Sequence, residues 1–109
     1  YLYCCVFLSF NAASKDYLIV LKDHLFYPAE IVVRANEKVR LLIENQDSTP
    51  EEFDSFDLNR EKVLYPNRKS VIYIGPLTPG RYEFFGEFSP NTARGAVIAT
   101  EKEGSDANN

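Results

Sequence analysis

Carboxylate side chains gather in one stretch of this chain, and they are the residues best able to do chemistry. Between positions 44 and 61 a single base, Arg60, stands among the acids Glu44, Asp47, Glu51, Glu52, Asp54, Asp57 and Glu61. Two further acids, Glu83 and Glu87, lie near the end of the chain. Carboxylate oxygens suit a hard cation such as ferric iron, or a loosely held divalent ion. The same density of acids is typical of a solvated loop, so the pattern leaves a metal site and plain surface charge both open.

Thiol and imidazole groups, the other common metal ligands, are scarce. Both cysteines, Cys4 and Cys5, lie in an apolar N-terminal stretch, and His24 is the only histidine. We expect His24 to be a surface or hydrogen-bonded residue rather than a ligand. Because this histidine has no evident partner in the sequence, no Ser–His–Asp or Cys–His arrangement can be assembled, and there is no glycine-rich phosphate loop. The sequence therefore predicts a protein that is not an enzyme.

The first 13 residues differ in composition from the rest of the chain. Residues 1–10 are apolar apart from Ser9, and Ala12 and Ala13 follow before a polar stretch. This order is typical of the end of a secretory signal peptide. An N-terminal membrane anchor is the alternative, although the apolar run is shorter than the ~20 residues that span a bilayer. We expect residues 1–13 to be a signal-peptide remnant, and the mature protein to be periplasmic and free of cysteine.

The overall charge is mildly acidic, with 12 Lys and Arg against 16 Asp and Glu and a formal net charge of -4. A protein that binds nucleic acid needs a basic stripe to contact phosphates. The charge therefore argues against nucleic acid as a main partner.

Short apolar runs separated by turn residues predict an all-β domain over residues 14–100, a Greek-key β-sandwich or barrel. We expect about seven strands, over residues 17–21, 30–33, 39–45, 60–66, 70–74, 81–88 and 95–101. Residues 46–59 read as a long connection in which Asp54 and Asp57 are turn residues. Tyr82, Phe84 and Phe88 should share one face and pack in the core. Gly95 should supply an unusual backbone angle, and residues 101–109 form a disordered tail.

Three segments of the sequence, "HLFYPAEIVV", "IENQDSTPEEFDS" and "GPLTPGRYEFFGEFSPNTARG", together resemble the cupredoxin family. They look closest to its periplasmic branch associated with iron uptake, of the Efe and Ftr kind. The resemblance covers residues 23–100. It implies an exported β-sandwich that holds a metal at one end.

The blue-copper ligands of that family are missing at all four places where the resemblance puts them. The first histidine corresponds to Glu51 or its neighbour Glu52, the cysteine to Gly86, the second histidine to Ser89, and the methionine to Ala93 or Arg94. A trigonal copper site needs thiolate and imidazole ligands. We therefore expect no blue-copper centre and no electron transfer of that kind.

The resemblance also implies that the two acidic loops meet at one end of the sandwich. We then expect a site for a metal cation, iron or copper, formed by Glu51, Glu52, Glu61 and Glu87. The function that follows is an exported metal-binding accessory of iron or copper handling, with an inner-membrane iron permease as its partner. The alternative is a cupredoxin scaffold that has lost its metal and works as a protein-interaction module.

Overall fold

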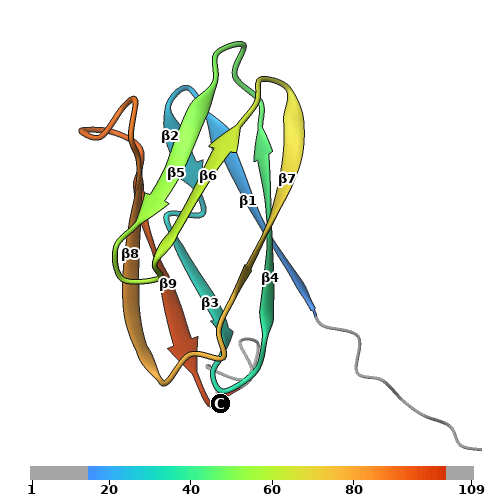
Figure 1. Cartoon of the computed structure of the whole chain (residues 1–109), viewed down its shortest axis with the longest axis vertical. Coiled ribbons are helices and arrows are strands. Elements are labelled where there is room, and N and C mark those ends of the chain that lie inside the picture. Colours follow the sequence, from blue (N-terminus) through green and yellow to red (C-terminus); the bar gives the residue numbers. More distant parts are fainter. Residues whose placement is uncertain (1–14, 103–109) are drawn as a thin grey trace, which may run out of the picture.

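The computed structural model describes residues 15–102, which form nine strands and no helix (Figure 1). The strands are β1 (Asp16–Lys22), β2 (Leu25–Tyr27), β3 (Glu30–Arg34), β4 (Val39–Asn45), β5 (Glu51–Ser55), β6 (Arg60–Leu64), β7 (Arg68–Ile74), β8 (Gly80–Gly86) and β9 (Arg94–Thr100). The predicted signal peptide and most of the predicted tail lie outside the described residues. Within residues 15–102 no helix is long and apolar enough to cross a membrane.

The strands pack as two sheets, which confirms the predicted β-sandwich. One sheet has the order β2-β1-β4-β7 and the other the order β3-β9-β8-β5-β6. Most neighbours are antiparallel, but β1 pairs with β4, and β3 with β9, in parallel. Figure 1 shows the two layers facing each other with their strands running along the long axis.

Side-chain alternation along the strands explains this architecture. In β4, Leu41 and Ile43 are fully buried, whereas Leu42 and Glu44 on the opposite face are partly exposed. Apolar side chains at every second position give each sheet one face that must be covered. The two apolar faces cover each other and form a single core.

Three phenylalanines tie the two sheets together. Phe53 of β5 stacks on Phe84 of β8, with ring centroids 4.9 Å apart. Phe26 of β2 meets Phe84 edge-on at 5.1 Å. Phe53 is 0% exposed and Phe84 is 1% exposed. Aromatic contacts of this kind add to the free energy gained by burial alone.

Two strands were not predicted. The segment Leu25–Tyr27 is short, and Glu51–Ser55 lies inside the expected long connection. The second error has a physical cause: acidic residues are depleted in strands, but pairing with β6 and β8 on either side overrides that preference. Phe88 also departs from expectation, since it follows the end of β8 and is 56% exposed.

Gly95 is required by lack of space, and the predicted unusual backbone angle is wrong. Among the described glycines, Gly75 is the one with a positive φ, of 87°. A Cβ atom on Gly95 would lie 2.5 Å from Cζ of Phe84 and 2.7 Å from the carbonyl oxygen of Ala29. The ring of Phe84 therefore packs directly on the backbone of β9.

We predict that Gly95→Ala destabilises the protein. The added methyl group would displace the Phe84 ring or the backbone, and overpacking of this kind costs about 1–3 kcal/mol. The melting temperature should fall by about 5–15 °C. Gly80→Ala is the matched control, because its Cβ would meet no atom closer than 3.8 Å. Equal melting temperatures for the two variants in a thermal unfolding scan would contradict the packing described here.

Candidate metal centre

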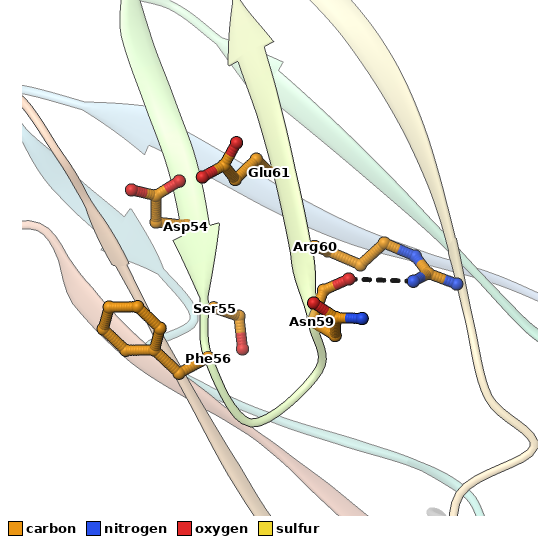
Figure 2. A pocket seen from close by; sticks show the side chains of 6 residues that line it. All are labelled: Asp54, Ser55, Phe56, Asn59, Arg60 and Glu61. Atoms are coloured by element: carbon orange, nitrogen blue, oxygen red, sulfur yellow. Dashed lines mark hydrogen bonds between the residues drawn. The ribbon is translucent and has the colours of Figure 1, made fainter.

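Three carboxylates converge on the outer face of the five-stranded sheet. Glu52 and Asp54 are two residues apart in β5 and leave the same face, while Glu61 of β6 lies directly opposite Asp54. One oxygen from each of the three lies within 4.8 Å of the others. Figure 2 shows the carboxylates of Asp54 and Glu61 side by side on adjacent strands. We call these three residues the carboxylate group.

Asp54 is the buried member of the carboxylate group. Its side chain is 9% exposed, and its Oδ1 atom is buried without a hydrogen-bond partner among the described residues. A buried polar atom that lacks a partner carries the full cost of its lost hydration. A bound cation would remove that cost.

Glu87 adds a fourth carboxyl group beside Asp54. Its backbone N–H donates to the carbonyl oxygen of Glu52 at 2.8 Å, which brings the turn after β8 next to β5. Burial raises the pKa of Asp54, the hydrogen bond with Glu87 opposes that shift, and the negative charges of Glu52 and Glu61 reinforce it. The hydrogen bond to Asp54 raises the pKa of Glu87.

A cavity of about 380 Å³ opens beside the carboxylate group. Its lining is formed by Asp54, Ser55, Phe56, Asn59, Arg60 and Glu61. Arg60 does not neutralise the acids, because its guanidinium donates to the carbonyl oxygens of Tyr73 and Asn59, each at 2.9 Å. Figure 2 shows Arg60 directed away from Asp54 and Glu61. The cavity is therefore negative at the end where the carboxylates lie.

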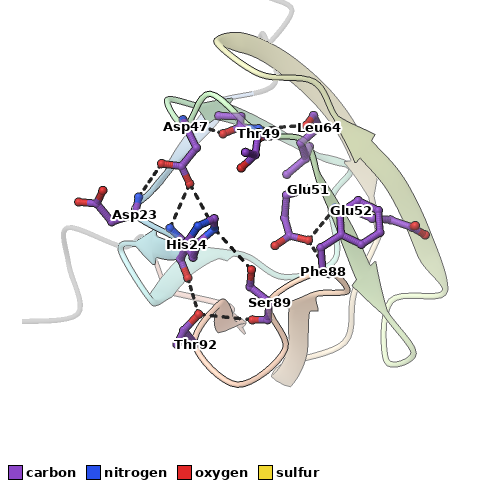
Figure 3. Close-up of polar contacts among 11 residues, drawn as sticks. Asp23, His24, Asp47, Thr49, Glu51, Glu52, Leu64, Phe88, Ser89 and Thr92 are labelled. Atoms are coloured by element: carbon purple, nitrogen blue, oxygen red, sulfur yellow. Dashed lines mark hydrogen bonds and ion pairs between the residues drawn. The ribbon is translucent and has the colours of Figure 1, made fainter.

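Glu51 points into the sandwich, away from the carboxylate group. It is 2% exposed, and its Oε1 atom accepts hydrogen bonds from the backbone N–H of Glu52 at 2.8 Å and of Phe88 at 2.7 Å (Figure 3). A Cβ atom on Gly86 would lie 2.6 Å from the carboxyl carbon of Glu51. The Glu51 carboxylate thus occupies the space that any larger residue at position 86 would need.

The four carboxylates expected at the site do not all meet. Glu52 and Glu61 lie together with Asp54, and the backbone of Glu87 is hydrogen-bonded to that of Glu52 outside this group. Glu51 lies on the opposite face of β5, because side chains alternate along a strand. Metal binding by any of these residues stays a prediction.

Asp54 was missed as a candidate ligand, since it was read as a turn residue. It lies within β5, and the turn begins after Ser55. The signal was present in the sequence: Glu52 and Asp54 alternate, and a short turn from Phe56 returns the chain at Arg60, which places Asp54 opposite Glu61. Asp57 does lie in that turn, where its carboxylate accepts from the backbone N–H of Glu83 at 2.9 Å.

His24 is an exposed, hydrogen-bonded residue, as expected. Its Nδ1 atom lies 3.4 Å from Oγ of Ser89 and 3.7 Å from Oδ2 of Asp47 (Figure 3). Both contacts use the same ring nitrogen, whereas a catalytic relay uses one nitrogen for each partner. The Asp47 carboxylate also accepts from the backbone N–H groups of Asp23 and His24, which both have positive φ. These contacts hold the β1–β2 turn in place.

The positions that correspond to blue-copper ligands carry no sulfur or imidazole. Gly86 faces the Glu51 carboxylate, and Ala93 is fully buried. Ser89 contacts His24, and Arg94 donates to the carbonyl oxygen of Pro90 at 2.9 Å while its guanidinium lies over the ring of Phe85. The described residues therefore contain no trigonal copper ligand set.

Comparison with known proteins gives a family and a relative. The profile of the family described as "Cupredoxin-like domain" matches residues 1–99. An uncharacterized protein of Rickettsia prowazekii (strain Madrid E) is 46% identical over 83 residues. That match covers 76% of this chain and 66% of the relative, so the chain spans just under two thirds of the relative's length.

Solved structures with a similar fold include copper proteins. Auracyanin A, a blue copper protein from Chloroflexus aurantiacus, superimposes with a TM-score of 0.68 at 10% identity, covering 81% of this chain and 100% of that one. The metal-binding domain of the Cu(I)-exporting P-type ATPase CopA of Streptococcus pneumoniae D39, with Cu(I), superimposes with a TM-score of 0.69 at 16% identity. This match covers 85% of this chain and 92% of that one. At these identities the likeness shows the fold alone.

We predict that Glu51→Ala destabilises the protein more than Glu51→Gln does. The alanine leaves the N–H groups of Glu52 and Phe88 without an acceptor and opens a cavity, and each unsatisfied donor costs about 1–3 kcal/mol. The glutamine retains an oxygen where Oε1 lies. Urea unfolding should therefore give a much lower midpoint for the alanine variant alone. Equal midpoints for the two variants would show that these hydrogen bonds do not hold the loop.

We also predict that Asp54→Asn stabilises the protein without metal, and more so at higher pH. Burial raises the pKa of Asp54 in the folded state. Its protonated form therefore adds to the free energy of unfolding below the unfolded pKa of ~3.9, and this gain is lost as pH rises through the folded pKa. Because asparagine does not ionise, the variant's stability does not decrease in this way as pH rises. In melting scans with a chelator, the variant's advantage should grow from pH 4 to pH 7. A constant difference across that range would contradict the prediction.

Proposed function

Because the chain belongs to the cupredoxin-like domain family, we propose that it is a metal-binding accessory protein that holds its cation with Glu52, Asp54 and Glu61. One observation carries the proposal: the buried Oδ1 atom of Asp54 has no hydrogen-bond partner among the described residues and belongs to a group of three convergent carboxylates. Keeping such a group together costs free energy unless a positive charge joins it. The site is therefore a cation site on the outer face of the sheet.

The oxygen ligands decide the class of cation. Carboxylates favour hard ions, whereas Cu(I) favours thiolate and thioether ligands. Ferric iron, or a divalent ion that keeps part of its water shell, fits a site with three carboxylates and an open side. Glu87 lies beside this group, because its backbone N–H donates to the carbonyl oxygen of Glu52 at 2.8 Å. Iron is thus a better candidate than copper for this site.

The proposed setting is the periplasm, in the handling of iron. The apolar run that ends at Ala12 and Ala13 supports export, and the resemblance to the iron-uptake branch supports an inner-membrane iron permease as the partner. In that setting the protein would bind the cation and pass it on, and it would carry out no catalysis itself.

A second function is a metal-free scaffold that binds another protein. The feature that favours it is Glu51, whose carboxylate fills the interior beside Gly86 and satisfies two backbone N–H groups without any metal. A domain whose metal end is closed in this way is stable without a metal there. The two functions differ in whether a cation stabilises the fold.

We predict that ferric citrate raises the melting temperature of the protein. A cation that binds only the folded state stabilises it by about 2.7 kcal/mol at a hundredfold excess over the dissociation constant. For a domain of this size the shift is about 10 °C or more. The double variant Glu52→Gln, Glu61→Gln should lose the shift, because two ligand charges are gone while their size is kept.

Glu37→Gln is the matched control, since Glu37 lies in the β3–β4 turn, outside the carboxylate group. Its variant should respond to ferric citrate like the wild type. Cupric ion should give no intense visible absorption, because the described residues hold no thiolate. A wild-type protein that shows no shift with ferric, manganous or cupric ion would leave the scaffold function as the answer.

A further inference from the structure

The outer face of the four-stranded sheet is apolar, although it points away from the core. We define this outer apolar face by its outward residues on four strands: Leu18 and Val20 of β1, Tyr27 of β2, Leu42 of β4, and Val71 and Tyr73 of β7. Leu18 is 47% exposed, Tyr27 51% and Tyr73 50%. Contiguous apolar patches on a monomer are rarely large unless another surface covers them.

Strand pairing makes these residues contiguous. Leu18, Leu42 and Val71 form one row across β1, β4 and β7. Val20 pairs with Tyr27, and Tyr73 lies at the end of the next row, beside Arg40. The apolar side chains therefore form a continuous strip across the sheet.

Charged residues of both signs border this strip. At one end Asp16 and Arg40 form an ion pair of 2.8 Å. At the other end Glu44 pairs with Lys69 across β4 and β7. The opposite side of the sandwich is different, because the carboxylate group gives it an excess of negative charge. Two copies of this acidic protein can therefore approach each other closely through the four-stranded sheet, while their carboxylate groups stay on the two far sides.

The order of the charges along the strands also fits a second copy. Consider a two-fold axis that lies between the two sheets and runs perpendicular to the strands, along the row of Leu42. Rotation about this axis places each strand over its own copy in the opposite direction. Arg40 of one copy then lies over Glu44 of the other, and Tyr73 over Lys69. The contact between Arg40 and Glu44 joins opposite charges and is favourable. The ring of Tyr73 already has Nζ of Lys38 from the same copy 5.6 Å from its centroid. The same operation stacks the row of Leu18, Leu42 and Val71 on its own copy.

We propose that the outer apolar face is the interface of a homodimer, formed by face-to-face packing of two four-stranded sheets. Sheets packed in this way lie about 10 Å apart with their strands roughly aligned. The proposal does not depend on the cation site, which remains open to solvent in the pair.

Sedimentation of the full chain, with a chelator present, tests the proposal. The wild type should pass from monomer to dimer as its concentration rises. Leu18→Lys should weaken the dimer at least tenfold, because two lysines would be buried in the interface. Val32→Lys is the matched control: Val32 is 38% exposed on β3, in the other sheet, and its variant should dimerise like the wild type.

Two outcomes would overturn the proposal. One is a monomer at every concentration up to the millimolar range, which would leave the face to a different partner. The other is a dimer that Leu18→Lys does not weaken, which would place the contact elsewhere in the chain.

Glu44→Arg tests the orientation, because the new arginine would face Arg40 of the second copy. An unchanged dimer dissociation constant in that variant would overturn the antiparallel stacking. Circular dichroism should confirm that each variant is folded.

Discussion

The position of Phe53 in the core is the constraint on which the rest of the structure depends. Phe53 is fully buried and stacks on Phe84, which fixes the register of β5 against β8. Since side chains alternate along a strand, an inward Phe53 sends Glu51 inward and Asp54 outward. A slip of one residue would exchange these faces and would put the charge of Asp54 in the core. The candidate site and the buried Glu51 carboxylate therefore share a single cause.

Two buried acids on this strand differ in what surrounds them. Glu51 is 2% exposed and accepts two backbone N–H groups, so its burial is compensated within the protein. Asp54 is 9% exposed, and its Oδ1 atom has no donor within the described residues. Burial alone would not distinguish them. The missing donor makes Asp54 a candidate ligand, whereas Glu51 is part of the framework.

The sequence allowed the sandwich to be predicted, because strands such as Val39–Asn45 carry apolar residues at every second position. It did not reveal β5, in which Phe53 is the one large apolar residue and the pairing partners are distant. Glu52 and Glu61 were placed at the site by family resemblance, but Asp54 was read through its turn propensity. The partners of His24 were missed for a related reason, since Asp47 and Ser89 lie 23 and 65 residues away in the chain.

The close approach of Gly86 and Glu51 restricts the order in which substitutions can accumulate. A cysteine at position 86 would place its Cβ 2.6 Å from the Glu51 carboxyl carbon and 2.9 Å from Cβ of Ala93. It would therefore be disfavoured until residue 51 had become smaller or had turned away. A smaller residue at position 51, in turn, would remove the acceptor for two backbone N–H groups. A thiolate at position 86 would therefore require a second change at position 51, and that change would itself destabilise the loop.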